Sequence, residues 1–329
     1  MKISILGSGS FAIAISKILT DNSHDVLMWT VDKEQVLEIN NERTSKFYYP
    51  NYKLSKKVKA TTDLKELIDF SNIIVIALPS KFIKPTLKKI NTKLKNNLNE
   101  YTFINMSKGI DNKNLVTISQ IIESVIDKKN IKSIASITGA SFASEILDKN
   151  ITRFILASSY DNKKNIKKIF ENDYIIVDES DDIIGVEILS SIKNVIALAS
   201  GIIAGLGYKE NTHAIIITLG LKEMFSLKDV FDISDNTIIS NSGVGDLVLT
   251  ASSKTSRNYI TGYNVGKSMN IDEAIKSAKT VVEGVECVKS IKKIERKYKI
   301  KLPITHSMYN IFCGYKNVRD EINKLLKSK

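Results

Sequence analysis

The stretch Ile3-Ser4-Ile5-Leu6-Gly7-Ser8-Gly9-Ser10-Phe11-Ala12 decides the fold of this chain. Its first four residues form an apolar strand pattern that runs directly into the spacing G-x-G-x-x-G/A, with Ala12 at the third position. Gly7 permits a tight turn, and Gly9 lets the backbone approach a pyrophosphate at the N-terminus of the helix that starts there. Because the motif follows a strand and opens a helix, we predict a dinucleotide site rather than a merely structural turn.

Strand and helix patterns alternate outward from this stretch through the first half of the chain. Apolar, strand-like runs occur at Ile3–Leu6, Val26–Trp29, Ile73–Leu78, Thr102–Asn105, Ile134–Ile137, Phe154–Ala157 and Tyr174–Val177. Amphipathic helical stretches lie between several of them, at Phe11–Leu19, Leu64–Phe70, Phe82–Leu94 and Leu115–Ile126. The alternation predicts an α/β N-terminal Rossmann-like domain with a mostly parallel sheet.

The strand pattern stops after about Asp182. The remainder has helical patterns at Ile184–Leu206, Ala214–Phe225, Asp272–Ala278, Val285–Tyr298 and Tyr315–Leu326. We therefore expect a dinucleotide-binding domain over residues 1–180, followed by an all-α C-terminal domain that binds substrate over residues 181–329.

The composition is that of a globular protein with a basic surface. Hydrophobic residues make up 43% of the chain, charged residues 26%, and the formal net charge is +12. Lysine pairs are scattered along the chain and alternate with apolar residues, which is typical of solvated helix faces. We therefore expect a small phosphorylated molecule as ligand, and no nucleic acid.

The rarer residue types exclude further classes. Cys287 and Cys313 give neither a disulfide framework nor a metal spacing, and the three histidines are dispersed, so no metal site is expected. The uncharged run after Lys193 covers about 15 residues, fewer than the ~20 that a membrane-spanning helix needs. No signal peptide precedes the first strand, so we expect a cytoplasmic protein without an integral membrane segment.

The end of the second predicted strand, Trp29-Thr30-Val31-Asp32, bears on the choice of cofactor. An acidic residue about 20 positions beyond the glycine motif usually holds the ribose 2′-hydroxyl of NAD, whereas an arginine suits the extra phosphate of NADP. Asp32 lies at about that distance, but it also suits capping of the next helix, and Lys33 could reach a phosphate. The sequence thus favours NAD over NADP weakly and leaves both open.

Lys193 is the single charge in the stretch Lys193–Gly207. In a helix it heads a stripe of small residues at i+4 spacing, formed by Ala197, Gly201 and Gly205, against which another element or a ligand can come close. A desolvated lysine has a lowered pKa and can exchange a proton near neutral pH. A lysine that is paired or extends its charge to water is the competing interpretation.

Three short segments of the second half carry polar side chains that suit a phosphorylated substrate. Gly243–Thr250 is a glycine-rich turn into an apolar helix, where Asp246 either caps the helix or takes part in chemistry. Ser256-Arg257-Asn258 offers a hydroxyl, a forked cation and an amide, and arginine can bind phosphate bidentately, although alone the trio is typical of a solvated turn. Val281-Val282-Glu283-Gly284 alone would indicate only a surface helix start.

Together with the lysine, these segments resemble the bacterial-type NAD(P)-dependent glycerol-3-phosphate dehydrogenase family. The match covers nearly the whole chain, with seven stretches in the family's order: Gly7-Ser8-Gly9-Ser10-Phe11, Ser107-Lys108-Gly109-Ile110, Gly139-Ala140-Ser141-Phe142-Ala143, Lys193-Asn194-Val195-Ile196-Ala197, Gly245-Asp246-Leu247-Val248-Leu249-Thr250, Ser256-Arg257-Asn258 and Val281-Val282-Glu283-Gly284. Any one could arise by chance, whereas seven in order are highly specific. The resemblance implies interconversion of dihydroxyacetone phosphate and sn-glycerol 3-phosphate with NAD or NADP, feeding glycerophospholipid synthesis.

The resemblance also implies roles for single residues. With the motif glycines Gly7 and Gly9, the cofactor-binding set is Ser10, Phe11, Lys108, Ala143, Arg257, Val281 and Glu283. The substrate-binding set is Lys108, Gly139, Ser141, Lys193, Asn194, Asp246, Ser256, Arg257 and Asn258. The catalytic set is Lys193 as proton donor and acceptor, with Lys108, Asp246 and Thr250. In this scheme the two lysines stabilise charge on the ketone oxygen, and Asp246 orients Lys193.

The chain departs from the family pattern at three positions. Ala12 replaces the last glycine of the loop, and Ala140 replaces a proline between two contacting residues. Val31 stands where the family often has a basic residue, which puts a preference for NADP in doubt.

Two other functions stay open at this point. A dehydrogenase of the same two-domain plan could act on another hydroxy acid, although Arg257 suggests a phosphate handle. A non-catalytic dinucleotide sensor would not need Lys108, Lys193 and Asp246. The sequence alone does not decide among these functions, and it does not show whether the protein is a homodimer.

Overall fold

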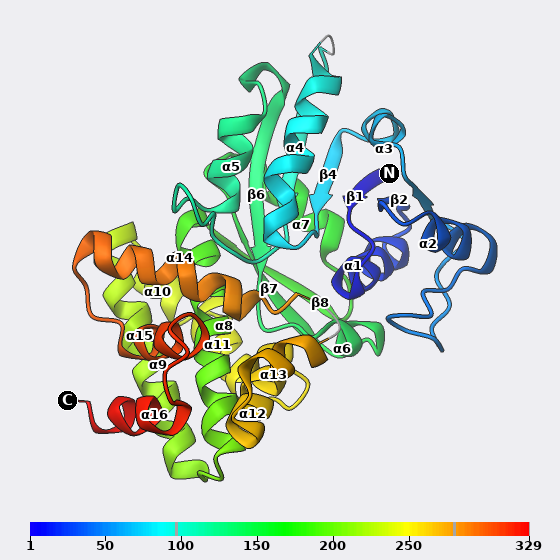
Figure 1. Cartoon of the computed structure of the whole chain (residues 1–329). Coiled ribbons are helices and arrows are strands. Elements are labelled where there is room, and N and C mark those ends of the chain that lie inside the picture. Colours follow the sequence, from blue (N-terminus) through cyan, green and yellow to red (C-terminus); the bar gives the residue numbers. More distant parts are fainter. Residues whose placement is uncertain (96–97, 279–280, 329) are drawn as a thin grey trace. The chain divides into compact units, whose positions relative to one another are not determined.

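The computed structural model describes residues 1–95, 98–278 and 281–328, and the chain divides into two compact units (Figure 1). The first unit comprises Met1–Ser107 and Ile118–Ile183. The second comprises Lys108–Thr117 and Ile184–Lys329. Segment Lys108–Thr117 therefore belongs to the second unit, although no feature of the sequence set it apart from the first half.

The first unit is built on an eight-stranded sheet with the order β3-β2-β1-β4-β5-β6-β7-β8. The strands are β1 (Lys2–Leu6), β2 (Asp25–Trp29), β3 (Val58–Thr61), β4 (Ile73–Ile76), β5 (Tyr101–Asn105), β6 (Ile131–Thr138), β7 (Thr152–Ala157) and β8 (Ile175–Ser180). Neighbouring strands run parallel except β6 and β7, which are antiparallel. The predicted α/β domain with a mostly parallel sheet is confirmed.

Helices connect the strands of the first unit (Figure 1). They are α1 (Ser10–Asp21), α2 (Lys33–Leu37), α3 (Leu64–Phe70), α4 (Ser80–Leu94), α5 (Ile118–Val125), α6 (Ala143–Leu147) and α7 (Lys163–Phe170), with short π and 3-10 turns at Glu38–Glu42 and Lys128–Asn130. The central strands are buried, as expected of a parallel sheet covered by helices, and β5 is buried along its whole length.

The glycine-rich turn occupies the point where the strand order reverses. Strands β2 and β3 lie on one side of β1 within the sheet, and the chain then returns to form β4 on the other side of β1. Open α/β sheets bind ligands at such a switch point, outside the carboxyl ends of the strands. The turn after β1 is therefore placed where a ligand site is expected.

Some boundaries differ from the sequence prediction. Strand β3 was missed, because it has only four residues, one of them an exposed lysine, and lies at the sheet edge. Helix α5 begins at Ile118 rather than Leu115, since Leu115 has a φ of 57°, in the left-handed region. The last helix begins at Val318 rather than Tyr315, whose φ is 48°.

The second unit consists of helices and turns throughout its described residues. The helices are α8 (Ile183–Gly205), α9 (Glu210–Phe231), α10 (Asp235–Ile238), α11 (Asp246–Ser252), α12 (Arg257–Ser268), α13 (Ile271–Ser277), α14 (Glu283–Tyr298), α15 (Pro303–Phe312) and α16 (Val318–Lys327), with a π turn, η3, at Asn241–Gly245. This confirms the expected helical C-terminal domain. The sequence patterns did not reveal α12, which is polar and contains two glycines, or α15, which begins with proline.

Helix α8 forms the centre of the second unit. Almost all its side chains are buried, and they join a core that includes Ile192, Val195 and Ile196. In the part of the chain that the structure describes, α8 alone is long and apolar enough to cross a membrane. Because 89% of its most apolar window is buried inside the protein, α8 has the environment of a core helix.

The stripe of small residues on α8 packs directly against the backbone of α12. A Cβ added at Gly201 would collide with the carbonyl oxygen of Tyr259, and one added at Gly205 with that of Tyr263. The contact is reciprocal, because a Cβ at Gly262 of α12 would collide with a backbone carbonyl of α8. Glycine is thus required on both helices, and this pair of facing surfaces is called the glycine seam below.

Replacing Gly201 by alanine should destabilise the protein by roughly 1–3 kcal/mol or more, because the colliding carbonyl belongs to a helix backbone that cannot move aside. The loss would outweigh the gain in helix propensity that Gly→Ala brings elsewhere. Denaturant unfolding of Gly201→Ala measures it. Ala204→Ser, which adds one heavy atom at a half-buried position of the same helix, is the control and should be near neutral. Equal stabilities of the two variants would contradict the seam.

Glu223 of α9 is a buried carboxylate that caps the N-terminus of α15. Its Oε1 accepts hydrogen bonds from the backbone N–H groups of Ile304 and Thr305, the latter at 3.2 Å, and its Oε2 accepts from the Thr305 hydroxyl at 2.8 Å. Burial raises the pKa of Glu223 to about 8, although these three donors act to lower it.

The raised pKa of Glu223 should make stability depend on pH. Between its unfolded pKa of 4.5 and its folded pKa of about 8, the folded state binds the proton more tightly, so this contribution to stability is complete below pH 4.5 and is lost as the pH rises through 8. The slope is at most about 1.4 kcal/mol per pH unit. Melting temperatures of wild type and Glu223→Gln at pH 5 and pH 8 test it, with exposed Glu273→Gln as control. The melting temperature of Glu223→Gln should fall less between pH 5 and pH 8 than that of the wild type. An equal fall in both proteins would contradict the prediction.

Candidate active site

The second unit brings two lysines, a carboxylate and a hydroxyl into one cluster. Lys193 of α8 forms an ion pair with Oδ1 of Asp246 and donates a hydrogen bond to Oγ1 of Thr250 at 2.8 Å. The Nζ of Lys108 lies 3.3 Å from Oδ2 of the same aspartate. The Thr250 hydroxyl donates to Oδ1 of Asp246 at 3.2 Å. Each carboxylate oxygen therefore serves one lysine.

Burial differs sharply between the two lysines. The side chains of Lys193 and Asp246 are 3% and 1% exposed, whereas that of Lys108 is 24% exposed. Lys193 therefore pairs its charge inside the protein and does not extend it to water. Two ammonium groups and one carboxylate leave a net positive charge, which favours an anion or a developing oxyanion at the exposed side of the cluster.

The surroundings of Lys193 lower its pKa. Burial lowers the pKa of Lys193 well below its ordinary value of 10.5, the charge of Asp246 acts to raise that pKa, and the charge of Lys108 lowers it again. An amine with a pKa moved toward neutrality can both give and take a proton at physiological pH.

Local structure explains why Asp246 is available to the lysines. The N-cap of α11 is Gly245, which makes no side-chain capping hydrogen bond, so Asp246 is the first residue inside the helix and not its cap. The preceding turn η3 is tight, because a Cβ at Gly243 would collide with a backbone carbonyl of α10. The capping interpretation of Asp246 is therefore wrong, and its carboxylate is free to pair with both lysines.

Two serines that the sequence analysis did not single out hold the segment that carries Lys108. The backbone N–H of Gly109 donates to Oγ of Ser191 at 3.1 Å, and Ser191 precedes Lys193 by two residues on α8. The hydroxyl of Ser290 on α14 donates to the carbonyl oxygen of Ile110 at 3.2 Å. Only the tertiary structure reveals these contacts, since serine has no distinctive spacing in either helix.

Asn258 joins three of the motif segments. Its Nδ2 donates to Oδ1 of Asn194 on α8 at 2.9 Å, and its Oδ1 accepts from the backbone N–H of Gly284 at 2.9 Å. Gly284 follows Glu283, the first residue of α14, and a Cβ at Gly284 would collide with this arrangement. The predicted residues Asn194, Asn258 and Glu283 are thus held near one another by one side-chain amide.

The trio that begins with Ser256 starts a helix. Ser256 caps α12, its Oγ accepting from the backbone N–H of Tyr259 at 3.3 Å, and both Ser256 and Asn258 are buried. Arg257 is exposed at the first position of α12, where backbone N–H groups and a positive helix end also favour an anion. The trio is therefore not a solvated turn.

The first unit presents the glycine-rich turn as a cradle. Gly7 has a φ of 129°, its N–H donates to the carbonyl of Trp29 at 3.0 Å, and a Cβ there would collide with the carbonyl of Ala77. Gly9 is the N-cap of α1 and makes no side-chain capping bond within the described structure, which leaves the first N–H groups of Ser10 and its successors to a ligand. A pyrophosphate fits this donor set.

Tyrosines from the segment after α2 lie over this cradle. The hydroxyls of Ser10 and Tyr49 are 2.6 Å apart, and a Cβ at Gly9 would lie 3.8 Å from the hydroxyl of Tyr48. Tyr49 is a candidate cofactor residue that sequence reasoning missed. The signal in the sequence is the aromatic run Phe47-Tyr48-Tyr49 in an irregular segment, which has no helix or strand pattern.

The other predicted residues are distributed as follows. Gly139 and Ser141 follow β6, with the Ser141 hydroxyl donating to the Gly139 carbonyl at 3.1 Å, and Ala143 opens α6. Because β6 is parallel to β5, β4 and β1, these residues lie at the same edge of the sheet as Gly7–Phe11. Val281 lies two residues before the start of α14 in the second unit.

Asp32 caps helix α2. Its Oδ1 accepts from the backbone N–H groups of Glu34 at 2.9 Å and Gln35 at 3.1 Å. Its neighbour Val31 is 79% exposed. The capping interpretation is confirmed, and it does not by itself decide between NAD and NADP.

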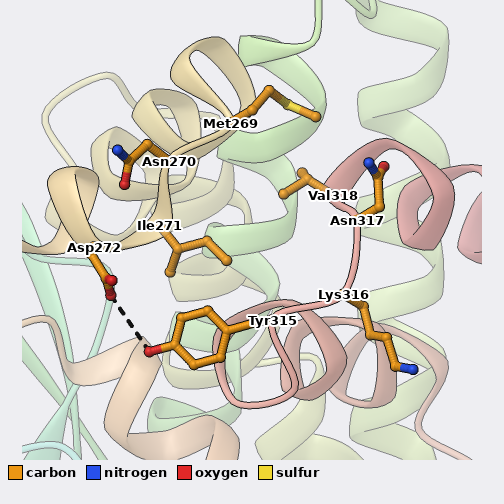
Figure 2. A pocket seen from close by; sticks show the side chains of 8 residues that line it. All are labelled: Met269, Asn270, Ile271, Asp272, Tyr315, Lys316, Asn317 and Val318. Atoms are coloured by element: carbon orange, nitrogen blue, oxygen red, sulfur yellow. Dashed lines mark hydrogen bonds between the residues drawn. The ribbon is translucent and has the colours of Figure 1, made fainter.

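A pocket of about 400 Å³ lies elsewhere in the second unit (Figure 2). It is lined by Met269, Asn270, Ile271, Asp272, Tyr315, Lys316, Asn317 and Val318, and the Tyr315 hydroxyl donates to Asp272 at 3.5 Å. Asn270 and Asn317 cap α13 and α16 there. None of these residues belongs to the predicted site. Across residues 1–95, 98–278 and 281–328, no group of three or more His, Cys, Asp or Glu could hold a metal ion.

Comparison with known proteins gives a consistent result. Residues 2–165 match the family described as NAD-dependent glycerol-3-phosphate dehydrogenase N-terminus, and residues 182–323 match the C-terminus of the same family. The chain is 38% identical over 328 residues to glycerol-3-phosphate dehydrogenase (NAD(P)+) of Staphylococcus epidermidis, covering 99% of this chain and 98% of that protein. It is 35% identical over 327 residues to the Staphylococcus haemolyticus protein of the same name, with coverage of 99% and 97%. The crystal structure of glycerol-3-phosphate dehydrogenase from Coxiella burnetii has a TM-score of 0.93 at 28% identity, over 99% of both chains. The chain therefore belongs to the NAD-dependent glycerol-3-phosphate dehydrogenase family.

Proposed function

We propose that this protein reduces dihydroxyacetone phosphate to sn-glycerol 3-phosphate, and catalyses the reverse oxidation, with a nicotinamide dinucleotide as partner. The observation that supports it most is the buried cluster of Lys193, Asp246, Lys108 and Thr250 in a chain of this family. A sensor would have no use for a buried proton donor, so this cluster also argues against a non-catalytic role.

The first unit supplies the residues that would hold the dinucleotide. The N–H groups at the start of α1 and the turn Gly7–Gly9 would bind the pyrophosphate, with Ser10, Phe11 and Tyr49 beside them. When bound, the dinucleotide supplies or accepts the hydride. Ala143 at the start of α6, and Lys108, Arg257, Val281 and Glu283 of the second unit, complete the proposed cofactor set.

The second unit supplies the residues that would bind and protonate the substrate. Arg257 and the N-terminus of α12 would bind the phosphate dianion. As hydride reaches the ketone carbon, negative charge develops on its oxygen, and the ammonium groups of Lys108 and Lys193 stabilise it. Lys193 then donates a proton to that oxygen, which yields the secondary alcohol. Asp246 and Thr250 orient Lys193 throughout.

The remaining substrate residues have more indirect parts in this scheme. The side chains of Asn194 and Asn258 bind each other, so we assign Asn258 a contact through its backbone N–H and a supporting role for its amide. Gly139 and Ser141 of the first unit are proposed substrate residues because of the family resemblance alone. Ser256 would act by fixing the start of α12.

We further propose that the cofactor is NAD rather than NADP. The segment that follows β2 carries the apolar Val31 and the carboxylate of Asp32, and neither favours the extra phosphate of NADP. Steady-state kcat/KM for NADH and NADPH, each with dihydroxyacetone phosphate, measures the preference. A higher value for NADPH would refute it.

The same assay tests the function itself. We expect oxidation of NADH with dihydroxyacetone phosphate as acceptor, and formation of sn-glycerol 3-phosphate. This product would supply glycerophospholipid synthesis. Purified protein that oxidises neither dinucleotide with this substrate would overturn the proposal. Faster turnover of an unphosphorylated hydroxy acid than of glycerol 3-phosphate would instead favour the related dehydrogenase considered above.

A further inference from the structure

The side chain of Gln35 makes two hydrogen bonds to the glycine-rich turn, although nothing in the surrounding sequence marks this residue. It lies on the short helix α2, and its Oε1 accepts from the hydroxyl of Ser8 at 2.6 Å while its Nε2 donates to the carbonyl oxygen of Ser8 at 2.9 Å. The hydroxyl and the backbone carbonyl of Ser8, the middle residue of Gly7-Ser8-Gly9, are therefore held by one amide.

The same amide also reaches two other segments that border the turn. Thr30, which directly follows β2, donates from its hydroxyl to Oε1 of Gln35 at 3.3 Å, and Nε2 donates to Oγ of Ser45 at 3.5 Å. Ser45 belongs to the segment that carries Tyr49, whose hydroxyl meets Ser10. Gln35 thus connects the turn, the end of β2 and the tyrosine segment.

A glycine-rich turn needs such a restraint if it is to bind a phosphate tightly. Glycine has more backbone freedom than any other residue, so ordering the turn on binding would cost conformational entropy and weaken affinity. Gly7 already stands in the left-handed region with a φ of 129°, and its N–H is fixed by Trp29. The two hydrogen bonds of Gln35 to Ser8 restrain the next residue as well, before any ligand arrives.

We propose that Gln35 is a positioning residue that holds the turn Gly7–Gly9 in the conformation that accepts a dinucleotide pyrophosphate, and so sets dinucleotide affinity without taking part in hydride or proton transfer. This inference rests on the proposed function, because it concerns the cofactor site of that enzyme. The affinity for the dinucleotide would then depend on a residue outside the G-x-G-x-x-G/A pattern.

The test is the variant Gln35→Leu, which keeps the size of the side chain and removes all its hydrogen bonds. Trp29, the only tryptophan of the chain, ends β2 and contacts Gly7 through its carbonyl, so quenching of its fluorescence reports NADH binding. We expect the Kd for NADH to rise about tenfold, as the loss of one to two net hydrogen bonds predicts. The KM for NADH should rise with it, and kcat at saturating NADH should stay within about twofold of wild type.

Asn40→Leu is the matched control. The amide of Asn40 also makes two hydrogen bonds to one residue in the first unit, donating to the carbonyl of Ala60 at 2.9 Å and accepting from its N–H at 2.8 Å, but at the sheet edge and away from the turn. Its loss should lower the melting temperature about as much as that of Gln35 and leave the Kd for NADH unchanged. Equal Kd values for wild type and Gln35→Leu, or equal weakening in both variants, would overturn the proposal.

Two further measurements separate this inference from the function on which it rests. Binding of ADP-ribose by calorimetry involves no turnover: weakening by Gln35→Leu supports the positioning role even if the substrate is misassigned, whereas wild-type protein that binds neither NADH nor ADP-ribose refutes the cofactor site itself. Ser8→Ala combined with Gln35→Leu should weaken NADH binding no more than Gln35→Leu alone, because both remove the same contact. Additive weakening would contradict a shared role.

Discussion

Replacing Lys193 by alanine will lower kcat for the reduction of dihydroxyacetone phosphate by about 10²–10⁴-fold, the usual contribution of a general acid. Asp246 and Thr250 hold the ammonium group in place, and a water molecule that fills the vacated space is a much weaker acid than an ammonium group. KM for the substrate should change less than kcat, because Lys193 acts on charge that develops only in the transition state.

Lys292→Ala provides the control for this experiment. Lys292 is also a buried lysine paired with a carboxylate, that of Glu295, but it lies on α14 outside the cluster. Its loss should reduce stability and leave kcat near wild type. A Lys193→Ala protein that keeps near-normal turnover would refute the assigned role of the lysine, though not the function.

The pH profile of the wild-type enzyme should carry the mark of the same residue. Reduction of the ketone requires the ammonium form of Lys193, so its rate falls as the pH rises through the lowered pKa of Lys193. Oxidation of glycerol 3-phosphate requires the neutral amine and should rise over the same interval. Profiles that move in the same direction for both reactions would exclude Lys193 as the group that exchanges the proton.

Replacing Asp246 by asparagine should cost both activity and stability. The change leaves the ammonium groups of Lys193 and Lys108 facing each other without a counter-charge, and breaking a buried ion pair in this way costs about 3–5 kcal/mol. Lys193 relieves the strain by losing its proton, so kcat for reduction should fall by roughly 100-fold or more. Denaturant unfolding and steady-state kinetics measure the two effects.

Two companion variants show whether the effect comes from the cluster. Asp235→Asn removes a carboxylate that pairs with Lys228 at the surface, where its side chain is 63% exposed, and should change stability by less than about 1 kcal/mol. Lys108→Ala added to Asp246→Asn removes one of the two facing charges and should restore part of the lost stability. The free energy of unfolding that Lys108→Ala costs is measured in the wild type and again in Asp246→Asn. Equal costs in the two backgrounds would mean that the two lysines do not interact through Asp246.

The fold could be predicted from the sequence wherever one local pattern was sufficient. The turn after β1 and the buried strands have strong signals, because they combine apolar runs with glycine at fixed spacing. Strand β3 and helix α15 could not be found in this way. A four-residue edge strand has almost no pattern, and the start of α15 is stabilised by Glu223, which lies 80 residues earlier in the sequence.

The candidate site shows the same division. Lys193 stood out because it is a lone charge in an apolar stretch, and the turn Gly243–Thr250 drew attention to Asp246. The resemblance added Lys108 and gave Asp246 and Thr250 their roles. Only the three-dimensional structure shows that Lys193 pairs with one carboxylate oxygen of Asp246 and Lys108 with the other. Ser191 and Gln35 could not have been selected from the sequence, because each acts by holding a backbone group of a distant segment.

The glycine seam has a consequence for the residues that are proposed to act on the substrate. Successive turns of α8 meet successive turns of α12 along the seam, and just ahead of it Asn194 meets Asn258. Lys193 and Arg257 immediately precede those two asparagines, so the close packing of the seam also holds the two backbone segments that carry the proposed proton donor and the proposed phosphate ligand. The placement of these segments is therefore a property of the helix pair, and side chains in place of the seam glycines would push the two helices, and the two segments with them, apart.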